Sequence, residues 1–268
     1  MLLWSIYHSV MKQAKRFITN NYTLLVLGLL FVLCLWSLIS VKDGNGNFLF
    51  PSPVSAFEAI GKILKSKYTY QSIGWSLLRT FIGFAVALIL ALILGFFVGI
   101  CPKLQVFFKP LIIVFKAVPA AAFVYFFLAK SGSRWAPTFL VGLIAFPIIY
   151  EALIGGLNSI EDEILDQIKL DCLNPFTPVF KVKFPLTFPY LVIGMTSSFA
   201  LSLKTEIMAE IISGDTNYGL GSMISAYRNL DPTDLSPIFA IALIAVVIIL
   251  IISLITSLIE KKIKSKLL

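Results

Sequence analysis

Six charged side chains stand well inside the long apolar runs of this sequence, where an ionised group is costly unless it is paired or in contact with water. They are Arg79, Lys116, Glu151, Lys204, Glu206 and Glu210. Such side chains can pair between helices or bind a charged solute. Catalysis is not indicated, because the one histidine is His8 near the N-terminus and the three cysteines lack metal-ligand spacing. We therefore expect no cofactor, no metal site and no enzyme.

The elements that must position these charges are membrane-spanning helices. Hydrophobic residues make up 58% of the 268 residues and charged residues 13%, with a mean hydropathy of +0.92. Soluble domains contain about 45–50% apolar and about 25% charged residues. The apolar runs are continuous, so they predict helices and not barrel strands. The net charge of +8 fits basic flanks beside anionic lipid headgroups, and no nucleic-acid partner is expected.

Six runs approach or exceed the length that crosses about 30 Å of hydrocarbon as a helix. They cover residues 22–41, 74–100, 106–129, 136–157, 187–212 and 237–259. We expect an all-α membrane protein with one transmembrane domain at 22–268, preceded by a cytoplasmic segment at 1–21. Lysine and arginine residues place both termini and the loops 101–105 and 158–186 in the cytoplasm. The first run lacks a small-residue cleavage site, which indicates an uncleaved helix.

The loop at 42–73 should lie outside the cell, although it contains several lysines. Within it, residues 53–66 predict a short amphipathic helix on the outer membrane interface. Its expected apolar face consists of Val54, Phe57, Ile60, Ile63 and Leu64.

Small residues recur every four positions along the second run, and they are Gly83, Ala87, Ala91, Gly95 and Gly99. Such a stripe lets another helix approach closely. A contact within the chain is favoured, and a contact between two copies stays open. Pro119 and Pro147 are expected to interrupt the third and fourth runs, because proline removes a helical hydrogen bond.

The polar stretch 166–185 reads DQIKLDCLNPFTPVFKVKFP and resembles the cytoplasmic "EAA" loop of ABC-importer permeases. Asp166 stands at the acidic position, Cys172 at the glycine position, and Phe184-Pro185 at the closing apolar-Pro pair. The stretch departs from the pattern in having Asp for Glu, Gln167-Ile168 for two alanines, and Cys172 for glycine.

Further segments are similar to the sulfonate, taurine and nitrate branch of these permeases, in the same order and spacing over residues 50–225. They are Phe50-Pro51-Ser52-Pro53, Ser76-Leu77-Leu78-Arg79 with Gly83, Lys109-Pro110 with Val118-Pro119-Ala120-Ala121-Ala122, and Ala209-Glu210 with Tyr218-Gly219-Leu220-Gly221. The chain therefore resembles the transmembrane subunit of a type I ABC importer.

This resemblance implies a six-helix permease fold in the cell membrane, a homodimer with the solute path at its interface, two ATPase subunits, and an extracytoplasmic solute-binding protein. The sequence contains no GxxxxGK[ST] phosphate loop. ATP hydrolysis is therefore expected on a partner chain or on a fused domain absent from this sequence.

Three sets of site residues follow. Contact with the ATPase is expected from Asp166, Asp171, Cys172, Leu173, Asn174, Pro175, Phe176 and Pro185, with Asn174-Pro175 ending one helix and redirecting the chain. Arg79 and Glu210 are expected to form a structural ion pair. Lys116, Lys204 and Glu206 are candidates for the translocation path, and Lys204 could instead pair with a neighbouring helix.

The main alternative is a secondary transporter without an ATPase, a class that often shows inverted repeats; no convincing internal repeat is present. A membrane enzyme would need a nucleophile–base set or a metal cluster. The solute stays open among sulfonates, taurine, nitrate, vitamin precursors, metals and others, and so does the choice between a homodimer and a heterodimer.

Overall fold

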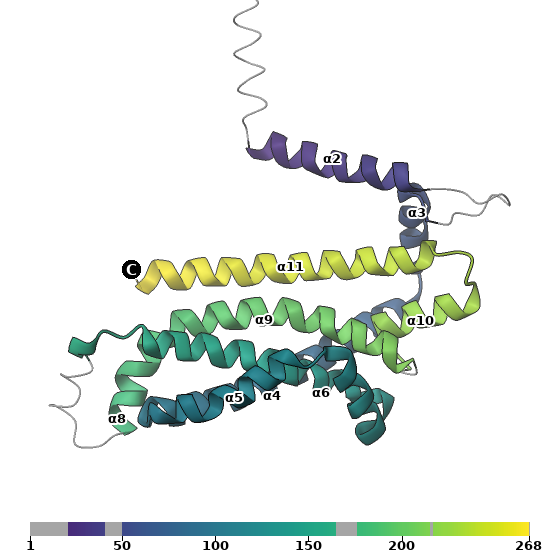
Figure 1. Cartoon of the computed structure of the whole chain (residues 1–268). Helices are drawn as coiled ribbons and strands as arrows, with labels where there is room; N and C mark the ends of the chain where they lie inside the picture. The colour runs from purple at the N-terminus through teal and green to yellow at the C-terminus, as the bar shows by residue number, and fades with distance from the viewer. Residues whose placement is uncertain (1–20, 41–49, 165–175, 215–216, 268) are drawn as a thin grey trace, which may run out of the picture.

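The computed structural model describes residues 21–40, 50–164, 176–214 and 217–267, and this part of the chain contains helices and no β-strand. Figure 1 shows most of the helices running along one direction in an elongated body. The helices are α2 (Asn21–Ile39), α3 (Pro53–Ile63), α4 (Lys67–Ile100), α5 (Lys103–Ala117), α6 (Ala120–Asn158), α8 (Phe176–Pro178), the π-helical turn η1 (Val179–Lys183), α9 (Phe184–Ser213), α10 (Leu220–Leu230) and α11 (Ser236–Leu267).

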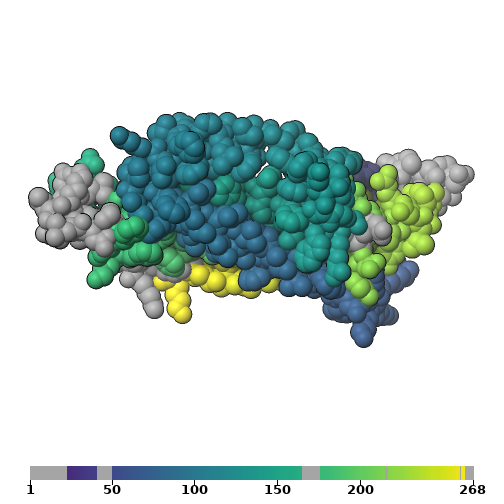
Figure 2. Space-filling view, turned by 90° about the horizontal axis from the view of Figure 1, so that it is seen from below, coloured from purple at the N-terminus to yellow at the C-terminus, as the bar shows by residue number. Residues whose placement is uncertain are grey.

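Four helical stretches of the described chain are long and apolar enough to cross a membrane. They are Lys67–Ile100, Ala120–Asn158, Phe176–Ser213 and Ser236–Ile259. The predicted segments 74–100, 136–157, 187–212 and 237–259 each lie within one of these four stretches. The first predicted segment corresponds to α2, which is apolar but shorter. In the space-filling view, α4, α5 and α6 cover most of the visible face (Figure 2).

The predicted helix at 106–129 is not continuous. Helix α5 ends at Ala117, Val118 is extended with φ −75° and ψ 129°, and α6 begins after Pro119. Proline disfavours the helical conformation of the residue before it, which explains the break. Helix α6 then runs to Asn158 through Pro147, and its backbone leaves helical geometry at Gly132, where φ is 72°. This left-handed conformation is accessible to glycine without a steric penalty.

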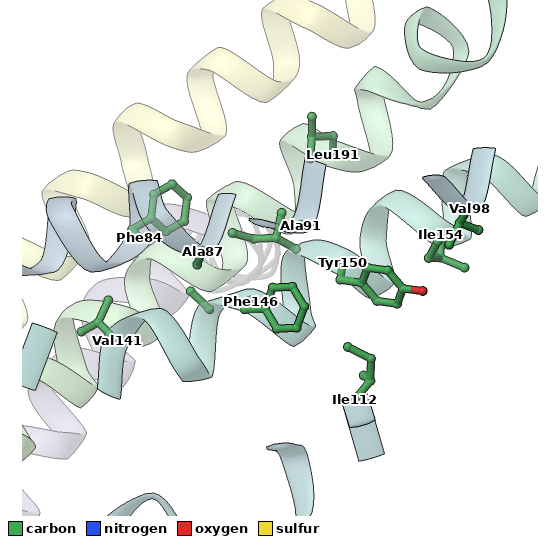
Figure 3. Packing of buried hydrophobic residues seen from close by; sticks show 12 residues of the cluster. Phe84, Ala87, Ala91, Val98, Ile112, Val141, Phe146, Tyr150, Ile154 and Leu191 are labelled. Atoms are coloured by element: carbon green, nitrogen blue, oxygen red, sulfur yellow. The ribbon is translucent and has the colours of Figure 1, made fainter. Parts of the chain in front are cut away.

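The small-residue stripe of α4 packs against α6 of the same chain. This agrees with the favoured prediction of a contact within the chain. Ala87 and Ala91 are fully buried in one cluster with Val141, Phe146 and Tyr150 of α6 (Figure 3). A Cβ atom added at Gly95 would collide with the side chain of Leu153. The two helices therefore approach as closely as glycine and alanine allow, and this contact fixes α4 against α6 without a hydrophobic drive from water.

The amphipathic helix expected near residue 53 is present as α3. Ser52 caps it, since its hydroxyl accepts the N–H of Ser55 at 3.1 Å. Its predicted apolar residues divide over two sides of the helix: Val54 and Phe57 are 66% and 55% exposed and so remain free for the membrane interface, whereas Ile63 is buried together with Ala56 and Ala59. Ala59 and Ile63 share a cluster with residues of α11. Small alanines permit this close contact, so the larger apolar side chains point outward.

Helix α2 is joined to the body near its C-terminal end. The indole of Trp36 donates to the carbonyl of Pro51 at 2.9 Å and stacks on Phe239 with ring centroids 6.0 Å apart. Phe50 meets the same phenylalanine edge-on at 4.9 Å. Most other side chains of α2 are exposed, as expected for a helix whose neighbours in the described chain are few (Figure 1).

Candidate functional site

A buried ionic site joins α4, α9 and α10 where the chain leaves α9. Arg79 Nη1 of α4 lies 2.8 Å from Glu210 Oε1 of α9, and the two side chains are 4% and 0% exposed. The same Nη1 atom donates to the carbonyl of Tyr218 at 2.7 Å. The guanidinium group also lies over the ring of Trp75, 5.5 Å from its centroid. The structure thus brings together the two residues that the sequence paired.

Three further hydrogen bonds complete this site. The hydroxyl of Ser76 lies 2.9 Å from both carboxyl oxygens of Glu210, and its oxygen accepts the N–H of Leu220 at 2.9 Å. The N–H of Gly221 donates to Glu210 Oε2 at 2.9 Å. Leu220 and Gly221 open helix α10, whose first N–H groups have no partner within the helix. The carboxylate and the serine therefore cap α10 from two other helices, where the positive end of the helix dipole favours an anion.

Glycine is required where α10 meets the carboxylate. Gly219 has φ 155°, and a Cβ atom there would lie 2.6 Å from Glu210 Oε2. A Cβ atom on Gly221 would lie 2.6 Å from Glu210 Cβ and 2.8 Å from the backbone nitrogen of Ile211. The Tyr218–Gly221 segment can wrap around Glu210 because it has no side chain at these two positions.

The two other charges of α9 lie on different sides of the helix. Lys204 is exposed, on the same side as the exposed Leu201 and Met208. It has no hydrogen bond or ion pair with another described residue. Glu206 is fully buried, and neither of its carboxyl oxygens has a hydrogen-bond partner in the described chain. Glu206 therefore presents no surface to a solute path in this conformation.

Lys116, the third path candidate, forms an exposed ion pair. Its Nζ lies 2.9 and 2.8 Å from the two carboxyl oxygens of Glu151 on α6. The side chains of Lys116 and Glu151 are 50% and 48% exposed, in contrast to the buried pair of Arg79 and Glu210. The pair links the end of α5 to α6, next to the break before Pro119.

At the other end of the bundle, one phenylalanine of α4 holds the start of the 176–213 helix. The ring centroid of Phe96 lies 6.1 Å from that of Phe176, 4.8 Å from that of Phe180 and 6.4 Å from that of Phe184. Lys183 Nζ donates to the carbonyl of Gly99 at 2.6 Å. Gly99 lies in the last turn of α4, where the backbone carbonyls have no partner within the helix. A lysine can bind these carbonyls, and its positive charge is stabilised by the negative end of the helix dipole.

Most of the predicted ATPase-contact residues fall outside the described part of the chain. These are Asp166, Asp171, Cys172, Leu173, Asn174 and Pro175. Of the two that are described, Phe176 is half exposed and opens α8, and Pro185 follows the π-helical turn η1 inside the continuous helical stretch Phe176–Ser213.

The site contains groups that side-chain patterns did not single out. Ser76 was noted only as part of a family segment, although it stands three positions before Arg79 and therefore shares its helix face. The N–H groups of Leu220 and Gly221 carry no side-chain signal. Phe96 was one phenylalanine among 23.

Comparisons with known proteins agree with this architecture. The sequence pattern of the family "Binding-protein-dependent transport system inner membrane component" matches residues 87–265. The putative aliphatic sulfonates transport permease protein SsuC of Bacillus subtilis (strain 168) is 20% identical over 233 residues, which cover 87% of this chain and 83% of SsuC. The nitrate import permease protein NrtB of Leptolyngbya laminosa is 29% identical over 159 residues, 56% of each chain.

Among solved structures, a chain of the MetNI methionine ABC transporter in an inward-facing conformation superposes with a TM-score of 0.63. The superposition covers 73% of this chain and 95% of that chain, at 16% sequence identity. This likeness shows a shared fold.

Proposed function

Because this chain belongs to the family of inner membrane components of binding-protein-dependent transport systems, we propose that its helices form the solute path of an importer driven by ATP hydrolysis on a separate chain. The observation that carries the proposal is the family match over residues 87–265, which includes α6, α9 and α11. A solute-binding protein outside the cell delivers the solute, and closure of the ATPases opens the path.

The chain acts as a homodimer with two ATPase subunits, one path at the dimer interface and both termini in the cytoplasm. Six crossings require α2 as the first span, and α5 together with the part of α6 before Gly132 as the third. The break at Gly132 supports this division. At 1.5 Å per residue, the part of α6 after Gly132 extends about 39 Å, enough to cross the hydrocarbon once.

Residues 166–185 transmit the movement of the ATPase. Phe176 is the first residue of this segment that the structure describes, and its ring stacks on that of Phe96. Lys183 of the same segment binds the last turn of α4. A displacement of the loop is therefore delivered to two spanning helices, α9 by chain continuity and α4 by contact. Asn174-Pro175 is expected from its sequence to redirect the chain, which would let the loop act as a lever.

The position of Lys204 indicates that the solute carries an anionic group. It is an exposed cation on a spanning helix, flanked by the apolar Leu201 and Met208. An exposed cation in hydrocarbon is costly, whereas a water-filled path accommodates it. Two of the relatives are named for anions, aliphatic sulfonates and nitrate. Lys116, half exposed beside Glu151, is the second candidate for the path.

The test is reconstitution in proteoliposomes. The chain alone should hydrolyse no ATP, and together with its ATPase and binding protein it should accumulate solute only when ATP is supplied. Replacing Asn174-Pro175 by Gly-Gly should leave membrane insertion normal while weakening ATPase association and abolishing uptake. Solute uptake by the chain alone, driven by an ion gradient, would instead establish a secondary transporter.

A further inference from the structure

Glu206 is a buried acid that the contacts of the bundle leave without a hydrogen-bond partner. Its side chain is fully buried in α9, and both carboxyl oxygens lack a donor in the described chain. Glu210, one helical turn further on, accepts bonds from Ser76, Arg79 and Gly221. Two carboxyl groups of the same helix therefore lie in contrasting environments: Glu210 accepts several hydrogen bonds, and Glu206 accepts none from the described residues.

The charges near Glu206 do not balance a second carboxylate. The nearest charged groups are Glu210, one turn further along α9, and Arg79 of α4, which is paired with Glu210. Arg79 already donates to Glu210 and to the carbonyl of Tyr218. With both acids ionised, Arg79, Glu206 and Glu210 would carry a net charge of −1 in a site closed to water, where such a charge is strongly disfavoured.

The other helices packed on α9 offer no compensation. Helix α11 has no titratable residue between Ser236 and Ile259, and α10 has Tyr227 and Arg228 only in its last turn. On α6, Glu151 is half exposed and paired with Lys116, and the guanidinium of Arg134 lies over the ring of Trp75. Full burial also keeps lipid headgroups, solute and a second copy of the chain from reaching Glu206 in this conformation.

A proton is the remaining ligand that can neutralise this carboxyl group. We propose that Glu206 binds one proton while α4, α6 and α9 are packed as in this structure, and that it releases the proton to water when these helices separate. The proton leaves a carboxyl oxygen for a water molecule on the side that opens, and it returns as the helices close. Resting on the proposed transport function, this makes the opening of the path dependent on pH. One proton changes the opening equilibrium by up to about tenfold per pH unit.

The direct test is infrared spectroscopy of the purified chain in lipid, without ATPase or solute. The carbonyl stretch of a protonated carboxylic acid should be present in the wild type and absent in Glu206→Gln. Glu151→Gln is the matched control, because it removes an exposed acid and should leave the band unchanged. A spectrum with no difference in this band between the wild type and Glu206→Gln would overturn the assignment of the proton.

The second test measures thermal stability against pH in the same lipid. The packed state holds a proton that the unfolded chain loses, so stability of the wild type should fall as pH rises above the ordinary range for glutamic acid. Glu206→Gln should show a flatter profile, because its amide cannot ionise. Parallel profiles for the two proteins would contradict the proposal.

The third test uses the transporter assembled with its ATPase and binding protein. The pH dependence of uptake should be weaker in Glu206→Gln than in the wild type, and an identical dependence would remove the link to the transport cycle. The infrared and stability tests need no transport. They can therefore succeed even if the assembled complex shows no ATP-driven uptake, an outcome that would count against the proposed function alone.

Discussion

Ser76 and Glu210 are joined by a hydroxyl that lies 2.9 Å from each carboxyl oxygen, although 134 residues separate them in sequence. The same hydroxyl oxygen accepts the first N–H of α10. One serine of α4 thus connects the carboxylate of α9 to the start of the next helix. Without it, the N–H of Leu220 would be buried without a partner, and each carboxyl oxygen would keep only one donor, Arg79 or Gly221.

Ser76→Ala should therefore lower the free energy of unfolding by about 1–3 kcal/mol, the usual cost of leaving a buried polar group unsatisfied. Ser72→Ala is the matched control, because Ser72 lies one turn earlier on α4, is equally buried, and has a hydroxyl without a hydrogen-bond partner in the described chain. Its removal should be neutral or stabilising. Thermal unfolding in detergent compares the two variants, and equal losses would show that the Ser76 hydroxyl does not hold α10.

The Arg79–Glu210 pair should be strongly coupled. Arg79→Ala and Glu210→Ala each strand a buried charge and should each cost about 3–5 kcal/mol. The double variant should lose less than the sum, since residues in one hydrogen-bond network are not additive. The same cycle on Lys116 and Glu151, which are half exposed, should give a coupling of about 0–1 kcal/mol. Additive losses for Arg79 and Glu210 would remove the buried pair as a stabilising unit.

Phe96→Ala should uncouple ATP hydrolysis from transport. The change removes three ring contacts to the 176–184 segment, each worth about 0.5–1.5 kcal/mol beyond burial. The ATPase should still bind, because Phe96 lies on α4 and not in the 166–175 loop, while uptake per ATP falls. Phe81→Ala, an exposed phenylalanine of the same helix, is the control. Uptake per ATP that is unchanged in Phe96→Ala would exclude a role for this contact in coupling.

Lys204→Ala should reduce uptake with little effect on folding yield. A charge-assisted hydrogen bond is worth about 1.5–3 kcal/mol, so the uptake efficiency for an anionic solute should fall by about tenfold or more. Met208→Ala, one turn away on the exposed side, should change uptake much less. Vesicle uptake at matched expression measures both variants. Wild-type uptake by Lys204→Ala would remove Lys204 from the path.

The sequence could predict the features that depend on the length of the apolar runs and on the few charged residues within them. The runs at 74–100, 187–212 and 237–259 lie within helices because continuous hydrocarbon-facing residues leave few other conformations. The interruption at Pro119 was predicted, yet 106–129 was treated as one span. A hydropathy average does not register the extended backbone of Val118, because its side chain is apolar. The gap between the predicted segments 106–129 and 136–157 did indicate a break, and the backbone leaves helical geometry within it, at Gly132.

Features that depend on backbone groups or on tight packing could not be predicted. The N–H donors of Leu220 and Gly221 bind Ser76 and Glu210 without any side-chain signal. In α3, the exposed Phe57 agrees with an apolar face toward the membrane interface, but periodicity did not indicate that Ala59, on the other side of the helix, packs against α11. Periodicity reports which residues share a face, and it does not report which face fits a neighbour.

The distance along the chain between Arg79 and its partner has a consequence for biosynthesis. Glu210 is made 131 residues after Arg79. At roughly 5–20 residues per second, the arginine waits on the order of 10 s at the membrane before the carboxylate of Glu210 can reach it. Since an unpaired guanidinium is unfavourable in hydrocarbon, α4 reaches its final depth only after α9 and the start of α10 have been inserted. The second long helix to leave the ribosome exit tunnel is thus among the last to settle, and truncation before Glu210 should leave it shallow in the bilayer.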